Sequence, residues 1–204
     1  MPHTSKLQAL YAMISALCNI NPNSAFPIPL CFPSSAICQH VMRETDFVVD
    51  SATDSLGLMS VSAGDKIGMV GLFPGLIKTI DGAGAELVVI EKNEMLIQKF
   101  PELPITLDAT KLGTCNKILC TSTTILNNTL DEILACCSAG AFISIIGPTA
   151  GYFPDPLFAR GIDVVGGRVV KSGEPFLQLL SERKRWGDAT QRICFQKETY
   201  RSII

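Results

Sequence analysis

Several residue types and motifs that mark well-known functional sites are scarce or missing in this sequence. It has only two histidines, His3 and His40, and none of its eight cysteines forms a Cys-x-x-Cys pair. The spacing of a standard zinc site is therefore absent. No Walker A motif occurs, and no spacing indicates a Ser-His-Asp or Cys-His arrangement. The chain thus carries no ready-made motif for zinc binding, nucleotide hydrolysis or acyl transfer.

Charge and long apolar runs are also in short supply. Charged residues make up 18% of the chain and the net charge is -2, so there is no basic surface of the kind that nucleic acid requires. Gly, Pro or a charged residue interrupts every apolar run well before 18 residues, so we predict no membrane span. Residues 1–6 lack the features of a signal peptide. We therefore expect a cytoplasmic protein with neither a nucleic-acid nor a membrane partner.

The cysteines are numerous but poorly spaced for metal binding. Adjacent Cys136 and Cys137 point apart on a helix, and Cys120 lies in an apolar strand-like run. We predict that these three are reduced thiols of the core. The best metal-binding candidate is the group of Cys31, Cys38 and His40, whose spacing matches no standard zinc site.

The chain is long enough for one domain with a small appendage, and 47% of its 204 residues are hydrophobic. Residues 5–18 have a helical pattern. Residues 19–35 contain Pro22, Pro27, Pro29 and Pro33, which predict an extended, irregular segment. A short helix over residues 37–44 follows. We assign residues 1–63 to this N-terminal helix and proline-rich segment.

From Lys66 onward, strand-like and helix-like segments alternate. Strands are predicted at residues 67–70, 86–91, 118–120, 141–146 and 163–170. Helices are predicted at about residues 76–82, 93–100, 130–137 and 174–183, with a turn or short helix at 154–160. This alternation predicts an α/β fold over residues 64–204: a Rossmann-like, three-layer and mainly parallel sheet.

Ligands of such sheets bind beyond the carboxyl ends of the strands, so the residues that follow each strand are the site candidates. After the first strand, Gly71 and Gly75 allow a tight turn. Phe73 and Pro74 add bulk and remove an N–H where a pyrophosphate needs donors, which argues against ordinary NAD binding. Glu91 ends the second strand, as a ribose-binding residue or as a solvated strand end.

The densest group of neutral polar residues comprises residues 121–124 with Asn127 and Asn128. One interpretation is an anion-binding cradle at a helix N-terminus. The other is helix capping, by a box of Thr129 and Glu132 or by Asn128. Capping accounts for one or two of these residues, so we expect at least some of the rest to face a ligand. The loop at 147–156 is stiffened by three prolines, and its Tyr152 and Phe153 would cover a ligand or close the edge of the domain.

Three loop sequences and a later run together resemble the "Putative heavy-metal chelation" family: V-G-L-F-P at 70–74, T-S-T-T-I-L-N-N-T-L-D-E-I-L at 121–134, I-G-P-T-A at 146–150 and L-F-A-R-G-I-D-V-V-G-G at 157–167. The resemblance implies a Rossmann-like domain, preceded in longer members by an enolase-N-terminal-like domain, with a site in the cleft between them. The site positions that it marks are Gly71, Phe73, Pro74, Thr121, Thr123, Thr124, Asn128, Thr129, Gly147, Pro148 and Thr149. Leu72 departs from the family, whose members often have a polar residue there. The N-terminal part of about 63 residues is also short, and its Pro-rich centre would be a remnant of the enolase-like domain.

The resemblance favours a protein that binds or modifies a small anionic metal chelator, or its metal complex, at these strand ends. No cysteine lies within the three loop motifs, so a metal ion would arrive with its organic ligand. One alternative is a nucleotide- or S-adenosylmethionine-dependent transferase in which Glu91 binds a ribose. Another is a non-catalytic module completed by a partner chain. The positive mean hydropathy of +0.31 favours a homo-oligomer or such a partner.

Overall fold

The computed structural model describes residues 28–45, 47 and 55–202, with residues 28–34 described in their backbone alone. The helix predicted at residues 5–18 lies outside the described residues, and so does the segment at 19–27. The structure does not test the proposed domain division at residue 63, which stays a prediction.

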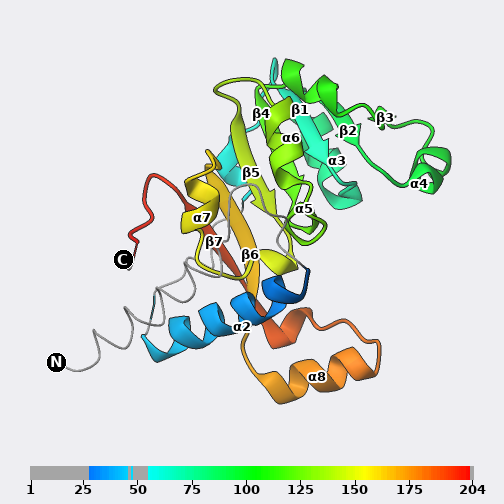
Figure 1. The fold of residues 1–204 in the computed structure, drawn as a ribbon. Coiled ribbons are helices and arrows are strands. Elements are labelled where there is room, and N and C mark those ends of the chain that lie inside the picture. The colour runs from blue at the N-terminus through cyan, green and yellow to red at the C-terminus, as the bar shows by residue number, and fades with distance from the viewer. Residues whose placement is uncertain (1–27, 46, 48–54, 203–204) are drawn as a thin grey trace.

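The centre of the molecule is a seven-stranded sheet in the order β3-β2-β1-β4-β5-β6-β7 (Figure 1). Its strands are β1 (Lys66–Val70), β2 (Glu86–Ile90), β3 (Ile105–Thr106), β4 (Lys117–Thr121), β5 (Phe142–Ile146), β6 (Val164–Val170) and β7 (Thr190–Gln196). All neighbours pair in parallel except β6 and β7, which are antiparallel. The order 3-2-1-4-5-6 is that of a doubly wound Rossmann sheet, so the predicted fold class is confirmed.

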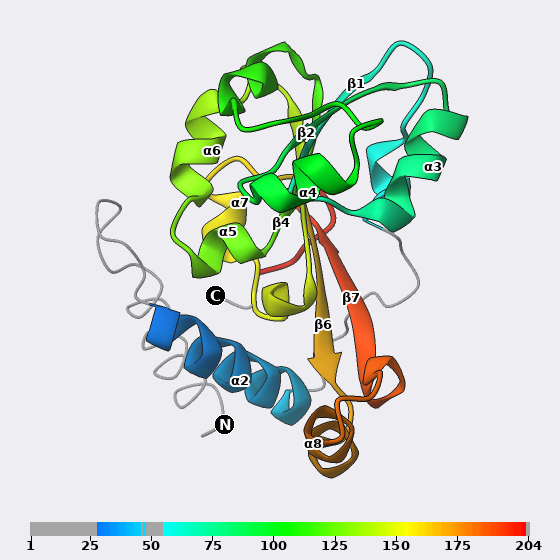
Figure 2. The same cartoon turned by 90° about the vertical axis from the view of Figure 1, so that its right-hand side faces the viewer.

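Helices cover both faces of this sheet. The helices of the described residues are α2 (Ile28–Glu44), α3 (Pro74–Gly82), α4 (Glu94–Lys99), α5 (Thr123–Leu126), α6 (Leu130–Cys136), α7 (Asp155–Phe158) and α8 (Gly173–Ser181), with 3-10 turns η1 (Gly57–Met59), η2 (Ala109–Thr114), η3 (Pro148–Ala150) and η4 (Gly187–Ala189). In Figure 2, α3 lies on one side of the sheet, and α2, α5, α6 and α7 lie on the other. Within the part of the chain that is described, no helix is long and apolar enough to span a membrane.

Successive side chains of the central strands point to opposite faces of the sheet, and a hydrophobic core lies on each face. Ile67 and Met69 of β1 point toward α3, where they pack with Ile80. Val70 points the other way, into the larger core that contains Ile133 of α6. Because a parallel sheet is covered on both faces, its strands are apolar on both sides. This explains why the sequence shows continuous apolar runs instead of alternating ones.

Helix α2 is longer than the helix that the sequence predicts at residues 37–44. We expected an irregular segment up to residue 35, yet α2 begins at Ile28 and contains Pro29 and Pro33. Pro29 lies in the first turn, where its missing N–H has no intrahelical partner in any case. Pro33 removes one hydrogen bond from the helix interior, at a cost of about 3 kcal/mol. Val41 and Met42 bury their side chains in the larger core, and about 2 kcal/mol for each offsets that cost.

The last strand is a second difference from prediction. We predicted no strand after the helix near residue 183, whereas β7 pairs with β6 at seven positions, from Val164–Gln196 to Val170–Thr190. The segment starts with polar Thr190, Gln191 and Arg192, which hide its strand character. Long-range pairing with β6 therefore decides its conformation.

A buried ion pair joins β1 and β4 at the amino edge of the sheet. The Asp65 carboxylate lies 2.7 Å from the Lys117 ammonium, and it also accepts hydrogen bonds from Asn116 and from the backbone N–H of Ser62. These bonds, led by that of Lys117, hold the pKa of Asp65 well below its ordinary value. The pair fixes the start of β1 against the start of β4.

We expect Asp65→Asn to lower the free energy of unfolding by about 2 kcal/mol near neutral pH, because the Lys117 ammonium, whose side chain is only 17% exposed, would lose its counter-ion. A carboxylate with a lowered pKa stabilises the fold above the pKa of the unfolded state and loses that effect as the pH falls. The difference between wild type and variant should therefore shrink below about pH 4. Urea unfolding across this pH range measures it.

The matched control is Glu86→Gln. Glu86 pairs with Lys66 at 3.9 Å, but its side chain is 77% exposed. We expect a loss of less than about 1 kcal/mol there. Equal losses in the two variants would contradict a special role for the buried pair.

Candidate functional site

A pocket of about 280 Å³ lies at the carboxyl ends of β1, β2 and β4. Its lining residues are Val70, Gly71, Leu72, Phe73, Ile90, Glu91, Lys92, Thr121, Thr123, Thr124, Asn127, Thr129 and Ile133. The volume is close to the lower end of small-molecule sites, which span roughly 300–1,000 Å³. Three parallel strands end at the same edge, so loops far apart in the sequence meet there.

Seven of the residues marked from the sequence line this pocket: Gly71, Phe73, Glu91, Thr121, Thr123, Thr124 and Thr129. Five are not among the lining residues: Pro74, Asn128, Gly147, Pro148 and Thr149. Lys92 and Asn127 line it although neither was in the predicted set. Lys92 follows Glu91 directly after β2. Its place after a predicted strand could have identified it from the sequence as a site residue. Asn127 belonged to the polar group, but the choice between it and its neighbour depended on the turn.

The turn after β1 uses its own backbone donors. Gly71 has φ of 81°, and a Cβ there would press on the side chain of Thr121, so this position requires glycine. The N–H of Leu72 donates to Glu91 Oε2 at 3.1 Å, and the N–H of Phe73 points at the sulfur of Met69. Pro74 has no N–H. The turn therefore presents few donors for a pyrophosphate, which agrees with the argument from the sequence against NAD.

Glu91 joins two of the pocket loops. Its Oε2 accepts from Leu72 after β1, and its Oε1 accepts from the N–H of Asn93 at 3.0 Å, at the start of α4. The carboxylate lines the pocket while it holds both loops. Glu91 is thus more than a solvated strand end, because it fixes the shape of the pocket wall.

The threonines after β4 divide into structural and available hydroxyls. Thr124 is 3% exposed, and its hydroxyl donates to the carbonyl of Thr121 at 2.7 Å. Thr123 is exposed and accepts from the hydroxyl of Thr121 at 3.1 Å. Because Thr123 accepts in this pair, its own hydroxyl proton is available to a bound molecule. Thr123 is the best-placed hydroxyl donor of the pocket.

Asn127 and Asn128 have different structural roles. Asn127 ends the four-residue helix α5, and its amide nitrogen faces the carbonyls of Thr123 and Thr124 and the hydroxyl of Thr129 at 2.7–3.2 Å. Asn128 adopts φ of 57°, and the N–H of Thr129 bonds back to the carbonyl of Thr124. This is the arrangement of a Schellman motif, in which the residue after the helix is left-handed.

The predicted capping box is not formed, whereas the predicted anion-binding cradle stays a prediction. Thr129 occupies the N-cap position of α6, but its side chain makes no capping bond and pairs with Asn127 instead. The polar residues surround both ends of α5, which is a single turn long. Such a turn has little macrodipole, so side chains must supply the attraction for an anion.

The loop after β5 supports the pocket from behind. The hydroxyls of Ser122 and Thr149 are 2.6 Å apart, and Ser122 is buried. Gly147 has φ of 148°, and a Cβ there would collide with the Ser122 hydroxyl. Phe153, which we expected either to cover a ligand or to close the domain edge, is 2% exposed within the larger core. It is therefore a core residue and not a lid.

Of the three cysteines predicted to be reduced core thiols, Cys120 is buried, and Cys136 and Cys137 are partly buried against the larger core. Cys120, Cys136 and Cys137 are free. Burial raises the pKa of Cys120 to about 11 and the pKa of Cys137 to about 12, so both are neutral at physiological pH. Cys38 is 1% exposed whereas His40 is exposed, so these two do not converge on a metal. Among residues 35–45, 47 and 55–202, whose side chains are described, no group of three or more His, Cys, Asp or Glu side chains is arranged to hold a metal ion, and the side chain of the candidate Cys31 lies outside this set.

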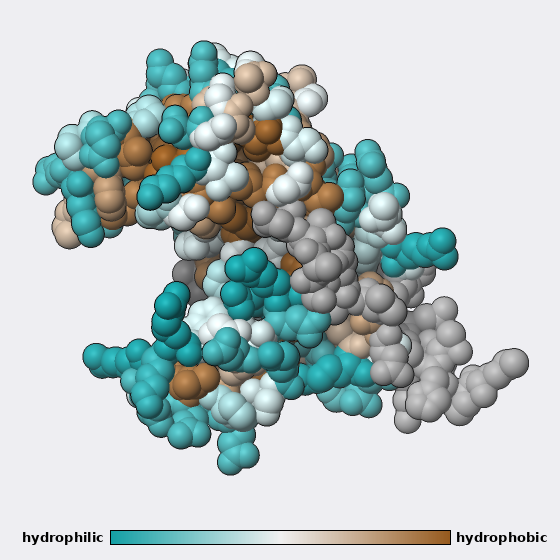
Figure 3. Space-filling model, turned by 180° about the vertical axis from the view of Figure 1, so that it is seen from behind, coloured by the Kyte–Doolittle hydropathy of each residue, from teal (hydrophilic) through white to brown (hydrophobic). Residues whose placement is uncertain are grey.

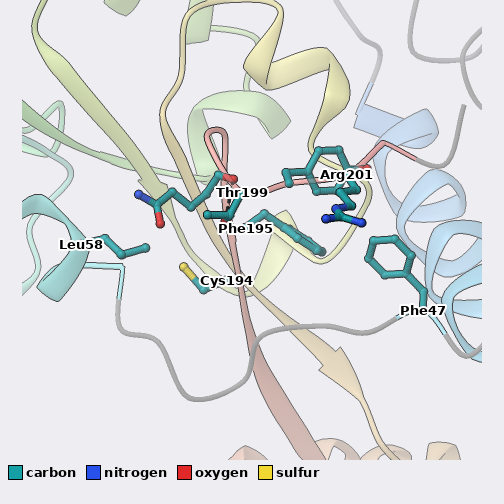
Figure 4. A pocket seen from close by; sticks show the side chains of 8 residues that line it. Phe47, Leu58, Cys194, Phe195, Thr199 and Arg201 are labelled. Atoms are coloured by element: carbon teal, nitrogen blue, oxygen red, sulfur yellow. Dashed lines mark hydrogen bonds between the residues drawn. The ribbon is translucent and has the colours of Figure 1, made fainter.

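A second cavity, of about 320 Å³, lies beside β7 (Figure 4). Phe47, Phe195 and Tyr200 contribute to its wall, and their ring centroids are 5.6–6.4 Å apart. Arg201 is the charged residue of its lining, and none of the predicted site residues is there. The aromatic rings pack on one another, so we interpret this wall as part of the core.

We expect the two asparagines to respond differently to substitution. Asn127→Ala should lower the free energy of unfolding by about 1 kcal/mol, because the carbonyls of Thr123 and Thr124 each lose one of their two donors. Asn128→Gly should leave it unchanged or raise it by up to about 1 kcal/mol, because glycine adopts the left-handed conformation more easily. Urea unfolding of both variants decides the matter. A larger loss in Asn128→Gly would overturn this division of roles.

Comparison with solved structures supports the fold. The chain is similar to a protein of unknown function of the DUF364 family from Pyrococcus horikoshii, with 19% identity and a TM-score of 0.67 over 83% of this chain and 66% of that chain. A DUF364 protein of unknown function from Desulfitobacterium hafniense gives 21% identity and a TM-score of 0.64 over 92% of this chain and 73% of that chain. This chain thus spans about two thirds to three quarters of the length of these relatives. Among curated proteins no match is found.

At these identities the solved structures bear on the fold alone. The family is shown by the sequence match over residues 54–197, which contains all three pocket loops and the loop after β5. The chain therefore belongs to the DUF364 family, described as "Putative heavy-metal chelation".

Proposed function

We propose that the protein binds a small anionic metal chelator, or the complex of a metal with such a chelator, in the pocket at the carboxyl ends of β1, β2 and β4. The observation that carries this proposal is the set of donors in the lining. Lys92 supplies an ammonium group, and Thr123 and Thr129 supply hydroxyls. Ammonium and hydroxyl donors suit carboxylate and other anionic oxygens.

Apolar and anionic parts of the lining fit the same ligand class. Phe73 and Ile133 offer contacts to a carbon skeleton. The carboxylate of Glu91, which accepts two backbone N–H bonds, suits a cationic part of the ligand, such as the metal ion of the complex, and not its anionic oxygens. A pocket of about 280 Å³ suits a small chelator.

The same lining is poorly suited to direct coordination of a soft metal. Thiolates and imidazoles are the preferred protein ligands of such ions. An ammonium has no lone pair to donate, and the thiol of Cys120 is buried with a pKa of about 11. In the proposed complex, the organic molecule holds the metal and the protein holds the organic molecule.

Native mass spectrometry of the purified protein, with metal analysis of the same sample, tests this proposal. We expect an adduct of chelator size, with or without a metal, that is lost in Thr123→Val because the hydroxyl donor is removed. If no adduct co-purifies, calorimetric titration with citrate and with its zinc complex provides the probe. Binding that is equal in wild type and Thr123→Val would contradict the proposed site.

The matched control is Thr114→Val. Thr114 lies before β4, at the opposite edge of the sheet, and its hydroxyl donates to the carbonyl of Lys111. This variant removes the same atoms from an exposed threonine outside the pocket. Retention of the adduct in Thr114→Val, with its loss in Thr123→Val, would assign binding to the pocket.

A second candidate ligand is an adenosyl compound such as S-adenosylmethionine. Glu91 favours it, because an acidic residue at the end of the second strand is where Rossmann-like proteins bind a ribose. Such a compound has no pyrophosphate and so does not need the donors that the turn after β1 lacks. This alternative predicts micromolar binding of S-adenosylmethionine that Glu91→Ala abolishes. Citrate binding without adenosyl binding would reject it.

A further inference from the structure

The candidate pocket contains one negative and one positive side chain that do not pair with each other. Glu91 and Lys92 follow β2 directly and are the two charged residues of the lining. Neither takes part in the ion pairs that the described residues form. A binding surface is complementary to its ligand in charge, so a pocket with both signs suits a ligand that carries both signs.

The carboxylate of Glu91 can accept further donors. It accepts the N–H of Leu72 at 3.1 Å on Oε2 and the N–H of Asn93 at 3.0 Å on Oε1. A carboxylate has about four acceptor sites on its two oxygens, so about two stay available. The two backbone bonds hold the group in one orientation in the pocket wall. A charged donor suits these remaining sites, because a hydrogen bond between ionised groups is roughly twice as strong as a neutral one.

The two charges lie in the same short stretch of the pocket wall. Glu91 and Lys92 are consecutive residues, whose Cα atoms are about 3.8 Å apart, and both line a pocket of about 280 Å³. A small ligand that meets both must carry its positive and negative groups close together. The hydroxyl proton of Thr123 is a further donor in the lining, and it suits a second anionic group.

Solvent reaches both charged side chains. Lys92 is exposed and Glu91 is partly buried. Figure 3 shows that the surface is hollowed between the part that carries α4 and the part that carries α8, on the side where the parallel strands end. A small molecule can therefore approach the pocket from this side.

We propose that the ligand is an aminocarboxylate, in which an amine lies one carbon away from a carboxylate. Its ammonium group donates to Glu91, and its carboxylates accept from Lys92 and Thr123. Aminocarboxylates are metal chelators, since amine nitrogen and carboxylate oxygen are both metal-binding groups. This inference rests on the proposed function, because it takes the same pocket as the binding site and narrows the class of ligand.

Of the two cationic groups that Glu91 could meet, an ammonium fits better than a metal ion. The neighbouring ammonium of Lys92 repels both, but a metal ion carries the higher charge. A cation that binds oxygen takes several oxygen ligands, and Glu91 is the one carboxylate of the lining. An ammonium needs only one or two acceptors, which Glu91 has to spare.

Titration calorimetry with two matched compounds tests the proposal. Iminodiacetate and oxydiacetate carry the same two carboxylates, but the central group is a protonated amine in the first and an ether oxygen in the second. We expect the metal-free wild type to bind iminodiacetate about tenfold more tightly, because a hydrogen bond between charged groups supplies at least that factor. Equal affinities, or tighter binding of oxydiacetate, would overturn the proposal.

The variant Glu91→Gln assigns the preference to one residue. It should lower the affinity for iminodiacetate about tenfold. It should leave the affinity for oxydiacetate unchanged or higher, because a charge that repels its carboxylates is removed. Binding of oxydiacetate thus reports that the pocket of the variant is intact. A preference for iminodiacetate that persists in Glu91→Gln would contradict the assignment.

Two further variants complete the set. Lys92→Gln should weaken the binding of both compounds alike, since both carry carboxylates. Glu94→Gln is the matched control, because Glu94 lies in the first turn of α4, is exposed and is not among the lining residues. We expect it to change neither affinity. Loss of the preference in Glu94→Gln as well as in Glu91→Gln would count against a direct contact with Glu91.

A measurement on the wild type keeps the test independent of how the variants fold. Raising the pH until the amine of iminodiacetate loses its proton should remove the preference, because the ligand then has no positive charge for Glu91 to meet. A preference that survives this change would overturn the proposal.

Zinc and citrate separate the remaining outcomes. If Glu91 meets a metal ion instead, zinc would tighten the binding of both compounds and neither would be preferred without it, which overturns the proposal. Citrate has no amine. Citrate binding that depends on Thr123, with equal affinities for iminodiacetate and oxydiacetate, would overturn this inference and leave the proposed function in place. If none of the three compounds binds, with or without zinc, both fail.

Discussion

The burial of β1 and β4 on both faces is the constraint on which the rest of the structure depends. Ile67, Met69, Ile118 and Leu119 are all fully buried. Parallel strands of this kind need long crossovers, and the helices of those crossovers must lie on the faces that they cover. Gly68 shows how close this packing is, because a Cβ there would meet side chains of Leu112 and Ile118. With both faces closed, a ligand can reach the centre of the sheet only at its ends.

The candidate pocket is a consequence of that arrangement. The chain leaves the sheet at the same edge after β1, β2 and β4, and hydrogen bonds order each of the three loops. Glu91 holds the first two loops together, and Thr121 with Asn127 orders the third. Such a lining is formed before a ligand arrives, so less conformational entropy is lost on binding. Lys92 and Thr123 then remain as the groups that can meet an anion.

Strands β6 and β7 extend beyond the rest of the sheet as a two-stranded ribbon. β6 continues beyond its parallel neighbour only because β7 provides an antiparallel partner for it. A two-stranded ribbon alone is of marginal stability, and the packing of Phe176 on Trp186 closes its end.

The sequence by itself determined the fold class, most of the strands and the edge at which the site lies. Continuous apolar runs separated by helical patterns have few other solutions, and Gly71, Glu91 and the threonines after β4 follow strand ends. Only the tertiary structure decided between neighbours in a turn, such as Asn127 and Asn128, because the left-handed conformation of one turns the other toward the pocket. The tertiary structure also decided where α2 begins, because the burial of Val41 and Met42 offsets the cost of its prolines. It decided the strand conformation of β7 as well, which depends on pairing with β6. In each of these cases the deciding contact joins residues distant in the chain or depends on a backbone angle, and no local pattern contains that information.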